Sequence, residues 1–217
     1  MANEKIDTSD FDALKLSVSS GKLGRLYVFH GEEKYLLEHY LTQIRKILVG
    51  DDFAEFNYKR FEGNISVDEL SAACDMLPAF AERTLVEVRD FDIFKANEET
   101  KQELLDVLAD LPDYICLIFV YDILEYHPDG RQKLAGFLKK EASVVEFSVQ
   151  DPSRLIKWIK THFSEAGKSI DTPTSEYLAF ITGGLMTRLN IEIEKVCSYT
   201  KETAVTRAHI DALVTPV

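Results

Sequence analysis

Short apolar runs alternate with amphipathic stretches along the first two thirds of the chain. Residues 26–30 form an apolar run that ends at Gly31, which predicts a buried strand. The stretch 35–48 then carries apolar residues at three- and four-residue spacing and stops before Gly50, which predicts a helix. The alternation of strand-like and helix-like segments continues as far as about residue 150.

The same rhythm predicts four more strands and three more helices. We expect the strands at 53–61, 85–88, 114–121 and 144–147, and the helices at 67–76, 97–111 and 130–140. The run 114–121 does not alternate between apolar and polar residues. That pattern is typical of a strand buried on both faces of a parallel sheet. The sequence therefore predicts a doubly wound α/β domain over residues 1–150.

The pattern changes at Asp151 and Pro152. Asp is a good helix cap and Pro fits the first helical turn, so a helix is expected to begin here. Beyond it we find only helical patterns, at about 174–182, 185–200 and 206–214. Residues 151–217 are therefore predicted to form a second, small, all-helical domain.

Charge supports this division of the chain. Of 217 residues, 37 are Asp or Glu and 25 are Lys or Arg, so the formal net charge is −12. Residues 1–150 hold 29 of the acids and 17 of the bases, whereas residues 151–217 hold 8 of each. Phosphate contacts need a basic field, so this acidic chain is not expected to bind nucleic acid on its own.

The sequence disfavours several other classes of protein. The longest apolar run is far shorter than the roughly 20 residues that span a bilayer. The first five residues, Met-Ala-Asn-Glu-Lys, contain no signal region, so we expect a cytoplasmic protein without a membrane partner. The three cysteines lie more than forty residues apart, and the five histidines show no metal-binding spacing. We therefore expect reduced thiols, no metal site and no cofactor.

The loop after the first strand, where α/β proteins often bind phosphates, is Gly31-Glu32-Glu33-Lys34. A phosphate-binding loop needs GxxxxGK[ST], but this loop has one glycine, two carboxylates and a lysine without a following hydroxyl. We interpret it as a degenerate nucleotide loop and expect no catalysis. Two alternatives stay open: an atypical NTPase using Lys34 and Asp122, or a regulatory α/β module with a phospho-acceptor acid at this loop.

The segment 76–83, Met-Leu-Pro-Ala-Phe-Ala-Glu-Arg, connects a predicted helix to the third strand. Pro78 is expected to end that helix at about Leu77. Three large apolar residues, Met76, Leu77 and Phe80, then lie at a loop. They either fold back on the core or form an exposed hydrophobic plug that inserts into a partner.

Three stretches of the chain carry a resemblance to a known family. They are 27–36 (YVFHGEEKYL), 76–86 (MLPAFAERTLV), and Gly183-Gly184-Leu185 continuing through Leu189, Glu192, Lys195 and Val196. In their order and spacing they resemble the delta subunit of the bacterial DNA polymerase III clamp loader. The resemblance implies an AAA+-like fold with a lost nucleotide site, in an accessory subunit of a DNA-directed DNA polymerase. Such subunits bind the ring-shaped sliding clamp and open it for loading on primed DNA.

The resemblance also implies which residues touch the clamp. The family's clamp-binding wedge falls on Leu77 and Phe80 as anchors, with Met76 and Pro78 in support. Relatives often have a large aliphatic residue before the key Phe, where this chain has Ala79. They also carry a third, helical collar domain, so we expect this chain to be a truncated fragment. The full-length protein would assemble with other loader subunits and meet DNA only within that complex.

Overall fold

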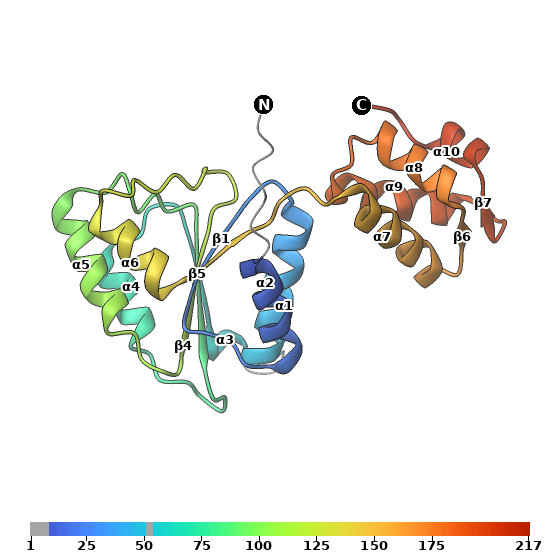
Figure 1. Ribbon diagram of the computed structural model, residues 1–217. Helices are drawn as coiled ribbons and strands as arrows, with labels where there is room; N and C mark the ends of the chain where they lie inside the picture. The colour runs from blue at the N-terminus through green and yellow to red at the C-terminus, as the bar shows by residue number, and fades with distance from the viewer. Residues whose placement is uncertain (1–8, 51–53) are drawn as a thin grey trace. The chain divides into compact units, whose positions relative to one another are not determined.

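The computed structural model describes residues 9–50 and 54–217 (Figure 1). Two sequence predictions concern residues outside these ranges. They are the absence of a signal region in the first five residues and the start of the predicted strand 53–61 at Phe53. Contacts divide the chain into two compact units. The first comprises residues up to Gly31 and 37–147, and the second comprises 32–36 and 148–217.

The first unit is built on five parallel strands in the order β2-β3-β4-β1-β5. The strands are β1 (Leu26–His30), β2 (Tyr58–Glu62), β3 (Thr84–Arg89), β4 (Ile115–Val120) and β5 (Ser143–Glu146). β1 lies between β4 and β5, with Val28 opposite both Phe119 and Val144. Non-sequential neighbours and parallel pairing require crossovers, which the helices provide. The predicted α/β class is confirmed.

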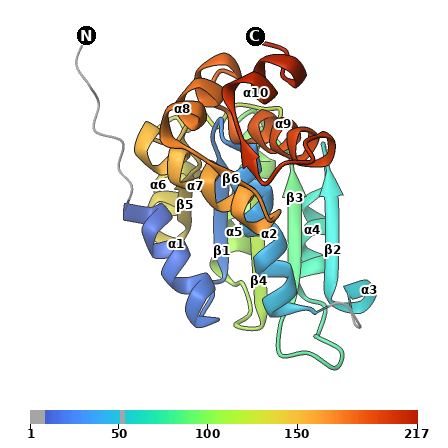
Figure 2. The same cartoon turned by 90° about the vertical axis from the view of Figure 1, so that its right-hand side faces the viewer.

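Helices cover both faces of the sheet (Figures 1 and 2). One face carries α1 (Ser9–Ser20) and α2 (Lys34–Leu48), and the other carries α4 (Val67–Cys74), α5 (Glu98–Ala109) and α6 (Lys133–Glu141). A single short turn, α3 (Ala54–Asn57), immediately precedes β2. In a parallel sheet the loops before the strands lie at one edge and the loops after them at the opposite edge.

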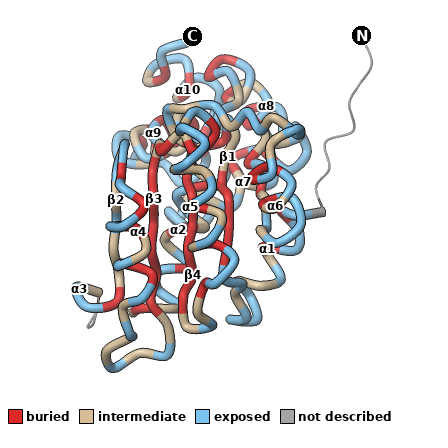
Figure 3. The backbone as a smooth tube through the Cα atoms, turned by 90° about the vertical axis from the view of Figure 1, so that its left-hand side faces the viewer, coloured by how far each residue is buried: buried red, intermediate tan, exposed pale blue. Residues whose placement is uncertain are grey.

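The central strands are buried on both faces (Figure 3). Every residue of β4 is buried, as its unbroken apolar run predicted. β3 is also buried throughout but alternates in character. Val86 and Val88 join the core beneath α4 and α5, while Glu87 and Arg89 alternate with them on the other face.

The second unit packs four helices around an apolar core. They are α7 (Pro152–Glu165), α8 (Thr172–Ile181), α9 (Met186–Tyr199) and α10 (Arg207–Leu213). Asp151 caps α7 as expected, because its carboxylate accepts the Arg154 N–H at 3.0 Å. The expectation of an all-helical unit is wrong in one respect. β6 (Ser169–Ile170) and β7 (Ala204–Val205) pair in parallel, and strands of two residues leave no periodic signal.

Three other sequence expectations need correction. Residues 54–57 are helical, so the predicted strand 53–61 begins only at Tyr58. α1 was not anticipated, because Phe11 and Leu14 alone supply its buried apolar contacts. α4 ends at Cys74, three residues before the stop expected from Pro78. Among the described residues, every helix is too short or too polar to cross a bilayer.

A candidate docking loop and the opposite edge of the sheet

The segment 75–83, called here the docking loop, joins α4 to the amino end of β3. α4 begins at a capping box, in which Ser66 and Glu69 each accept the other's backbone N–H. The helix ends when the Asp75 N–H donates to the Ser71 carbonyl at 2.9 Å. The docking loop therefore starts and ends on regular elements of the first unit.

The structure brings the two anchor candidates of the docking loop to the surface. Leu77 is 72% exposed and Phe80 is 85% exposed, while Met76 and Pro78 are half-buried. The interpretation in which all the large apolar residues fold back on the core is therefore wrong for Leu77 and Phe80. Exposed pairs of large apolar side chains on one short loop are typical of interaction surfaces.

The middle of the docking loop is held by a buried side chain. The Asn57 amide nitrogen donates to the Ala79 carbonyl at 2.7 Å, and the Ala79 N–H donates to the Asn57 amide oxygen at 2.7 Å. Asn57 is fully buried. Sequence analysis missed this residue because it lies in the run interpreted as a strand, and no motif marks it.

Arg83 fixes the end of the docking loop. Its guanidinium donates to three backbone carbonyls: those of Leu23 and Gly24 at 2.7 Å each, and that of Ile115 at 2.6 Å. Leu23 and Gly24 lie just before β1, and Ile115 is the first residue of β4. Arg83 thus joins the starts of three neighbouring strands.

Two more side chains hold the beginning of the docking loop. The Tyr114 hydroxyl donates to the Asp75 carbonyl at 3.2 Å, and the Thr84 hydroxyl donates to the Met76 carbonyl at 3.4 Å. Bonds at the beginning, middle and end leave the loop little conformational freedom. Its apolar side chains are therefore presented by an ordered backbone.

Phe80 has a left-handed backbone conformation, with φ of 59°. For a residue with a Cβ this region costs about 1–2 kcal/mol, and glycine is the residue that avoids the cost. The Phe80 ring recovers little of that cost by burial, since it is mostly exposed. A strained, exposed aromatic residue is a pattern associated with function rather than stability.

The loop after β1 has a different character. Gly31 has φ of 127°, and a Cβ there would lie 2.4 Å from the Phe147 carbonyl oxygen. The close approach of two backbone segments therefore requires glycine here, and this requirement does not depend on a bound phosphate. Glu32 is exposed, and its carbonyl accepts the Lys34 N–H at 3.0 Å.

Glu33 is fully buried within the second unit. Its carboxylate accepts the Met186 N–H at 3.1 Å, at the amino end of α9. Burial raises the pKa of Glu33, and the backbone N–H groups of Met186 and Tyr35 partly oppose that rise. The Glu33 carboxylate thus binds the N-terminus of α9. In nucleotide-binding proteins a helix N-terminus is a favourable position for a phosphate.

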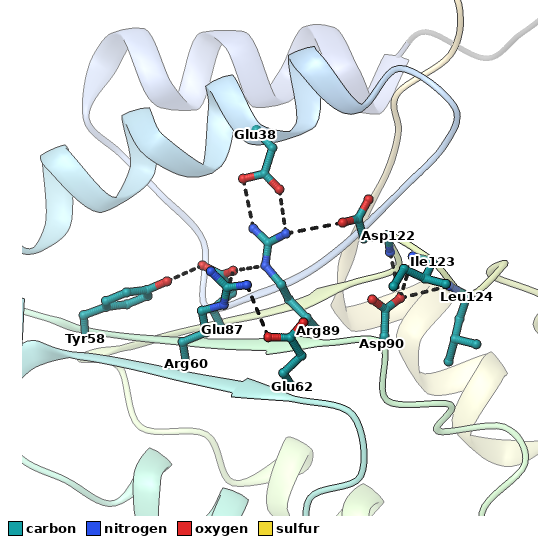
Figure 4. A network of polar contacts seen from close by, with 10 residues as sticks. All are labelled: Glu38, Tyr58, Arg60, Glu62, Glu87, Arg89, Asp90, Asp122, Ile123 and Leu124. Atoms are coloured by element: carbon teal, nitrogen blue, oxygen red, sulfur yellow. Dashed lines mark hydrogen bonds and ion pairs between the residues drawn. The ribbon is translucent and has the colours of Figure 1, made fainter. Parts of the chain in front are cut away.

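Asp122, the acid considered for an NTPase, lies after β4 near the cation of Arg89 (Figure 4). The Arg89 guanidinium is 3.7 Å from the Asp122 carboxylate and binds both oxygens of Glu38, at 2.5 and 3.0 Å. Arg89 also donates to Glu87, which is buried. Burial disfavours the charge, but the hydrogen bonds with Glu38 and Glu87 raise the pKa of Arg89 above its ordinary value. The Arg89 guanidinium, which stays charged, therefore lies beside the carboxylates that a metal ion would need as ligands.

Asp90 completes this edge of the sheet. Its backbone is left-handed, with φ of 52°, and one carboxylate oxygen accepts three consecutive N–H groups, those of Asp122, Ile123 and Leu124, at 2.9–3.0 Å (Figure 4). Such a nest of N–H groups is an anion site that the protein fills itself. Within residues 9–50 and 54–217 no group of three His, Cys, Asp or Glu side chains is placed to hold a metal ion.

The five-stranded parallel sheet with helices on both faces, together with the helical unit, defines an AAA+-like α/β protein. The family model for the DNA polymerase III delta subunit matches residues 27–148, which is more than half of the chain. The chain therefore belongs to the DNA polymerase III delta-subunit family.

Individual relatives agree with this assignment. DNA polymerase III subunit delta of Bacillus subtilis is 27% identical over 195 residues, covering 87% of this chain and 56% of the relative. Probable DNA polymerase III subunit delta of Aquifex aeolicus is 25% identical over 208 residues, covering 91% and 56%. The chain thus spans about half the length of the curated relatives it matches.

Solved structures support the fold. The Bacillus subtilis DNA clamp loader delta protein matches with a TM-score of 0.66 at 24% identity, covering 96% of this chain and 63% of that one. RuvB of Thermotoga maritima, a Holliday junction branch migration motor, matches with a TM-score of 0.60 at 14% identity, covering 98% and 68%. At these identities the similarity concerns the fold alone.

Proposed function

We propose that this protein is a non-catalytic clamp-loader subunit of DNA polymerase III that binds the sliding clamp and opens its ring for loading on primed DNA. Leu77 and Phe80 are the anchors of the contact, and Met76 and Pro78 support them. Other loader subunits are further partners, DNA is met only within that assembly, and the protein acts in the cytoplasm, where replication takes place. Family membership supports the class of function, and the docking loop supports the site.

The observation that carries the proposal is the state of Phe80. It is exposed, it occupies a backbone conformation that favours glycine, and its neighbour Ala79 is fixed by two hydrogen bonds to the buried Asn57 side chain. A partner with an apolar pocket gains a preordered anchor that has little entropy left to lose on binding.

Ring opening follows from differential affinity. A ligand shifts a conformational equilibrium only by the difference between its affinities for the two states. If the docking loop binds a clamp surface that is compatible only with the open interface, binding favours the open ring. No covalent step and no bound nucleotide are needed within this chain.

The alternatives have less support from the geometry. An atypical NTPase would need Asp122 to hold a metal ion, yet Asp122 faces the Arg89 cation and its N–H is bonded to Asp90. A regulatory module would need a cluster of accessible acids after β1, yet Glu33 is buried against α9 and Glu32 is the exposed one of the two. Titration with ATP and magnesium tests the first alternative, and a phosphoryl-donor assay tests the second.

The direct test is calorimetric titration of the chain into the sliding clamp of the same organism. Truncating an interface anchor costs about 2 kcal/mol or more, so Leu77→Ala/Phe80→Ala should weaken binding about a thousandfold. Both side chains are mostly exposed, so circular dichroism should report an unchanged fold. Saturable binding that survives in the double variant would reject this site, and a folded parent that does not bind would reject the function.

A further inference from the structure

We propose that Asn57 is the positioning residue of the docking loop, because its side-chain amide fixes the backbone of Ala79 and so sets the direction in which Phe80 leaves the loop. This inference rests on the proposed function for its biological meaning. Asn57 itself is fully buried, so its role in presentation is indirect. It acts through the two hydrogen bonds of 2.7 Å that join it to Ala79, 22 residues further along the chain.

These two bonds require one donor and one acceptor on the same side chain, and a primary amide supplies both at any pH. Ala79 offers one N–H donor and one carbonyl acceptor, and the Asn57 side chain supplies one acceptor and one donor to match them. A carboxylate can accept from the N–H but cannot donate to the carbonyl. An aliphatic side chain can do neither, and it would leave both Ala79 groups without their partner.

The two bonds lie in the middle of the docking loop, so Asn57 affects how Phe80 is presented and does not affect how the ends of the loop are fixed. Arg83, Thr84 and Tyr114 bind backbone carbonyls near the two ends of the loop and the starts of neighbouring strands. Asn57 holds Ala79, in the middle and next to Phe80. Removing Asn57 should therefore release the residues between the two fixed ends while β3 keeps its place in the sheet.

Because Phe80 has a left-handed backbone conformation, releasing Ala79 should change the backbone of Phe80 as well. A residue with a Cβ returns to negative φ when nothing prevents it, since that region is sterically preferred. Ala79, whose backbone precedes the strained residue directly, is the point at which Asn57 prevents that return. Without the amide, the Ala79 backbone loses both of these hydrogen bonds, and binding would have to reorder the loop beside Phe80.

The experiment uses the 217-residue chain and three variants. Asn57→Ala removes both bonds, Asn57→Asp removes the donor, and Asn97→Ala is the matched control. Asn97 caps α5 in the same unit through the Thr100 N–H at 2.8 Å, so its loss destabilises the unit without touching the docking loop. Two quantities are measured: affinity for the sliding clamp by calorimetry, and amide hydrogen exchange at Ala79.

We expect Asn57→Ala to weaken clamp binding about tenfold and to speed Ala79 exchange by at least about tenfold. Asn97→Ala should change neither quantity beyond about twofold. Asn57→Asp should resemble Asn57→Ala near pH 7.5. It should recover relative to the parent near pH 5 or below, because a protonated carboxyl offers one donor and one acceptor, and burial raises the pKa of an acid.

The outcomes separate this inference from the proposed function. A parent that does not bind the clamp rejects the proposed function, and Ala79 exchange then decides the role of Asn57 alone. A folded Asn57→Ala variant with parental exchange and parental affinity overturns the positioning role. If Asn57→Ala does not fold, Asn57→Asp provides the same test, because its pH-dependent recovery requires the amide-like bonding pattern.

Discussion

The two edges of the parallel sheet present opposite surfaces. At the carboxyl edge, charged groups satisfy one another: Arg89 binds Glu38 and Glu87, and Asp90 accepts three backbone N–H groups. At the amino edge, hydrogen bonds from the buried Asn57 side chain hold the backbone of the docking loop, while Leu77 and Phe80 are mostly exposed. At the carboxyl edge, polar groups therefore satisfy one another. At the amino edge, hydrogen bonds to the backbone hold a loop that exposes two large apolar side chains.

This difference shows how one fold can lose a small-ligand site at one edge of its sheet and carry a protein-binding site at the other. In α/β proteins the carboxyl edge is the usual place for a small ligand, because helix N-termini and loops converge there. Here a protein carboxylate, that of Asp90, fills the cluster of three N–H groups at this edge. The amino edge instead has the features of a protein–protein contact, with apolar anchors on an ordered support.

The largest expected effect on stability is at the carboxyl edge. Arg89→Leu removes the nearer of two cations from buried Glu87 and leaves it with Arg60, whose Nε lies 3.9 Å away. Breaking a buried pair costs several kcal/mol, here about 3 kcal/mol because Glu38 is half-exposed. Urea unfolding should show this loss, whereas clamp affinity of the folded variant should match the parent. Arg131→Ala, at an exposed pair with Asp129, is the control and should unfold at the parental midpoint. Equal midpoints for the two variants would contradict the account of this edge.

A smaller loss is expected at Asp90. Asp90→Ala removes the acceptor of three N–H groups and should lower the free energy of unfolding by about 2 kcal/mol. Asp90→Asn keeps an acceptor oxygen and tolerates positive φ, so it should lose less than about 1 kcal/mol. Thermal unfolding of both variants measures the difference. If Asp90→Asn lost as much as Asp90→Ala, the charge rather than the N–H nest would be responsible.

The smallest effect concerns the strain at Phe80. Phe80→Gly should be more stable than Phe80→Ala by about 1 kcal/mol, because only glycine adopts φ of 59° without cost. Neither variant should bind the clamp as the parent does, since both lack the ring. Equal stability of the two variants would show that the left-handed backbone carries no strain.

Sequence reasoning predicted what depends on local pattern. The apolar run of β4, the helix α2 and the cap at Asp151 each follow from spacing or from a single residue type, and all are present. The interpretation of the loop after β1 as a degenerate nucleotide loop stays a prediction, and it rests on the residues of that one loop. Periodicity is least informative over short runs, which explains the strand wrongly expected at 54–57.

The missed features depend on partners distant in sequence. Asn57 meets Ala79 across 22 residues, and Glu38 meets Arg89 across 51. Neither pairing leaves a motif, because any buried amide or carboxylate would look the same in the sequence. The exposure of Leu77 and Phe80 was likewise one of two interpretations until their surroundings were known.

The account's central claim is that Phe80 makes its contact because of where it is held, and a second exposed phenylalanine permits a matched comparison. Phe180, on α8, is 82% exposed against 85% for Phe80. Phe80→Ala and Phe180→Ala remove the same atoms from similarly exposed positions, and each is titrated into the sliding clamp by calorimetry. We expect Phe80→Ala to weaken binding by about 2 kcal/mol, or about thirtyfold, and Phe180→Ala to leave it unchanged. Equal affinities for the two variants would contradict the claim.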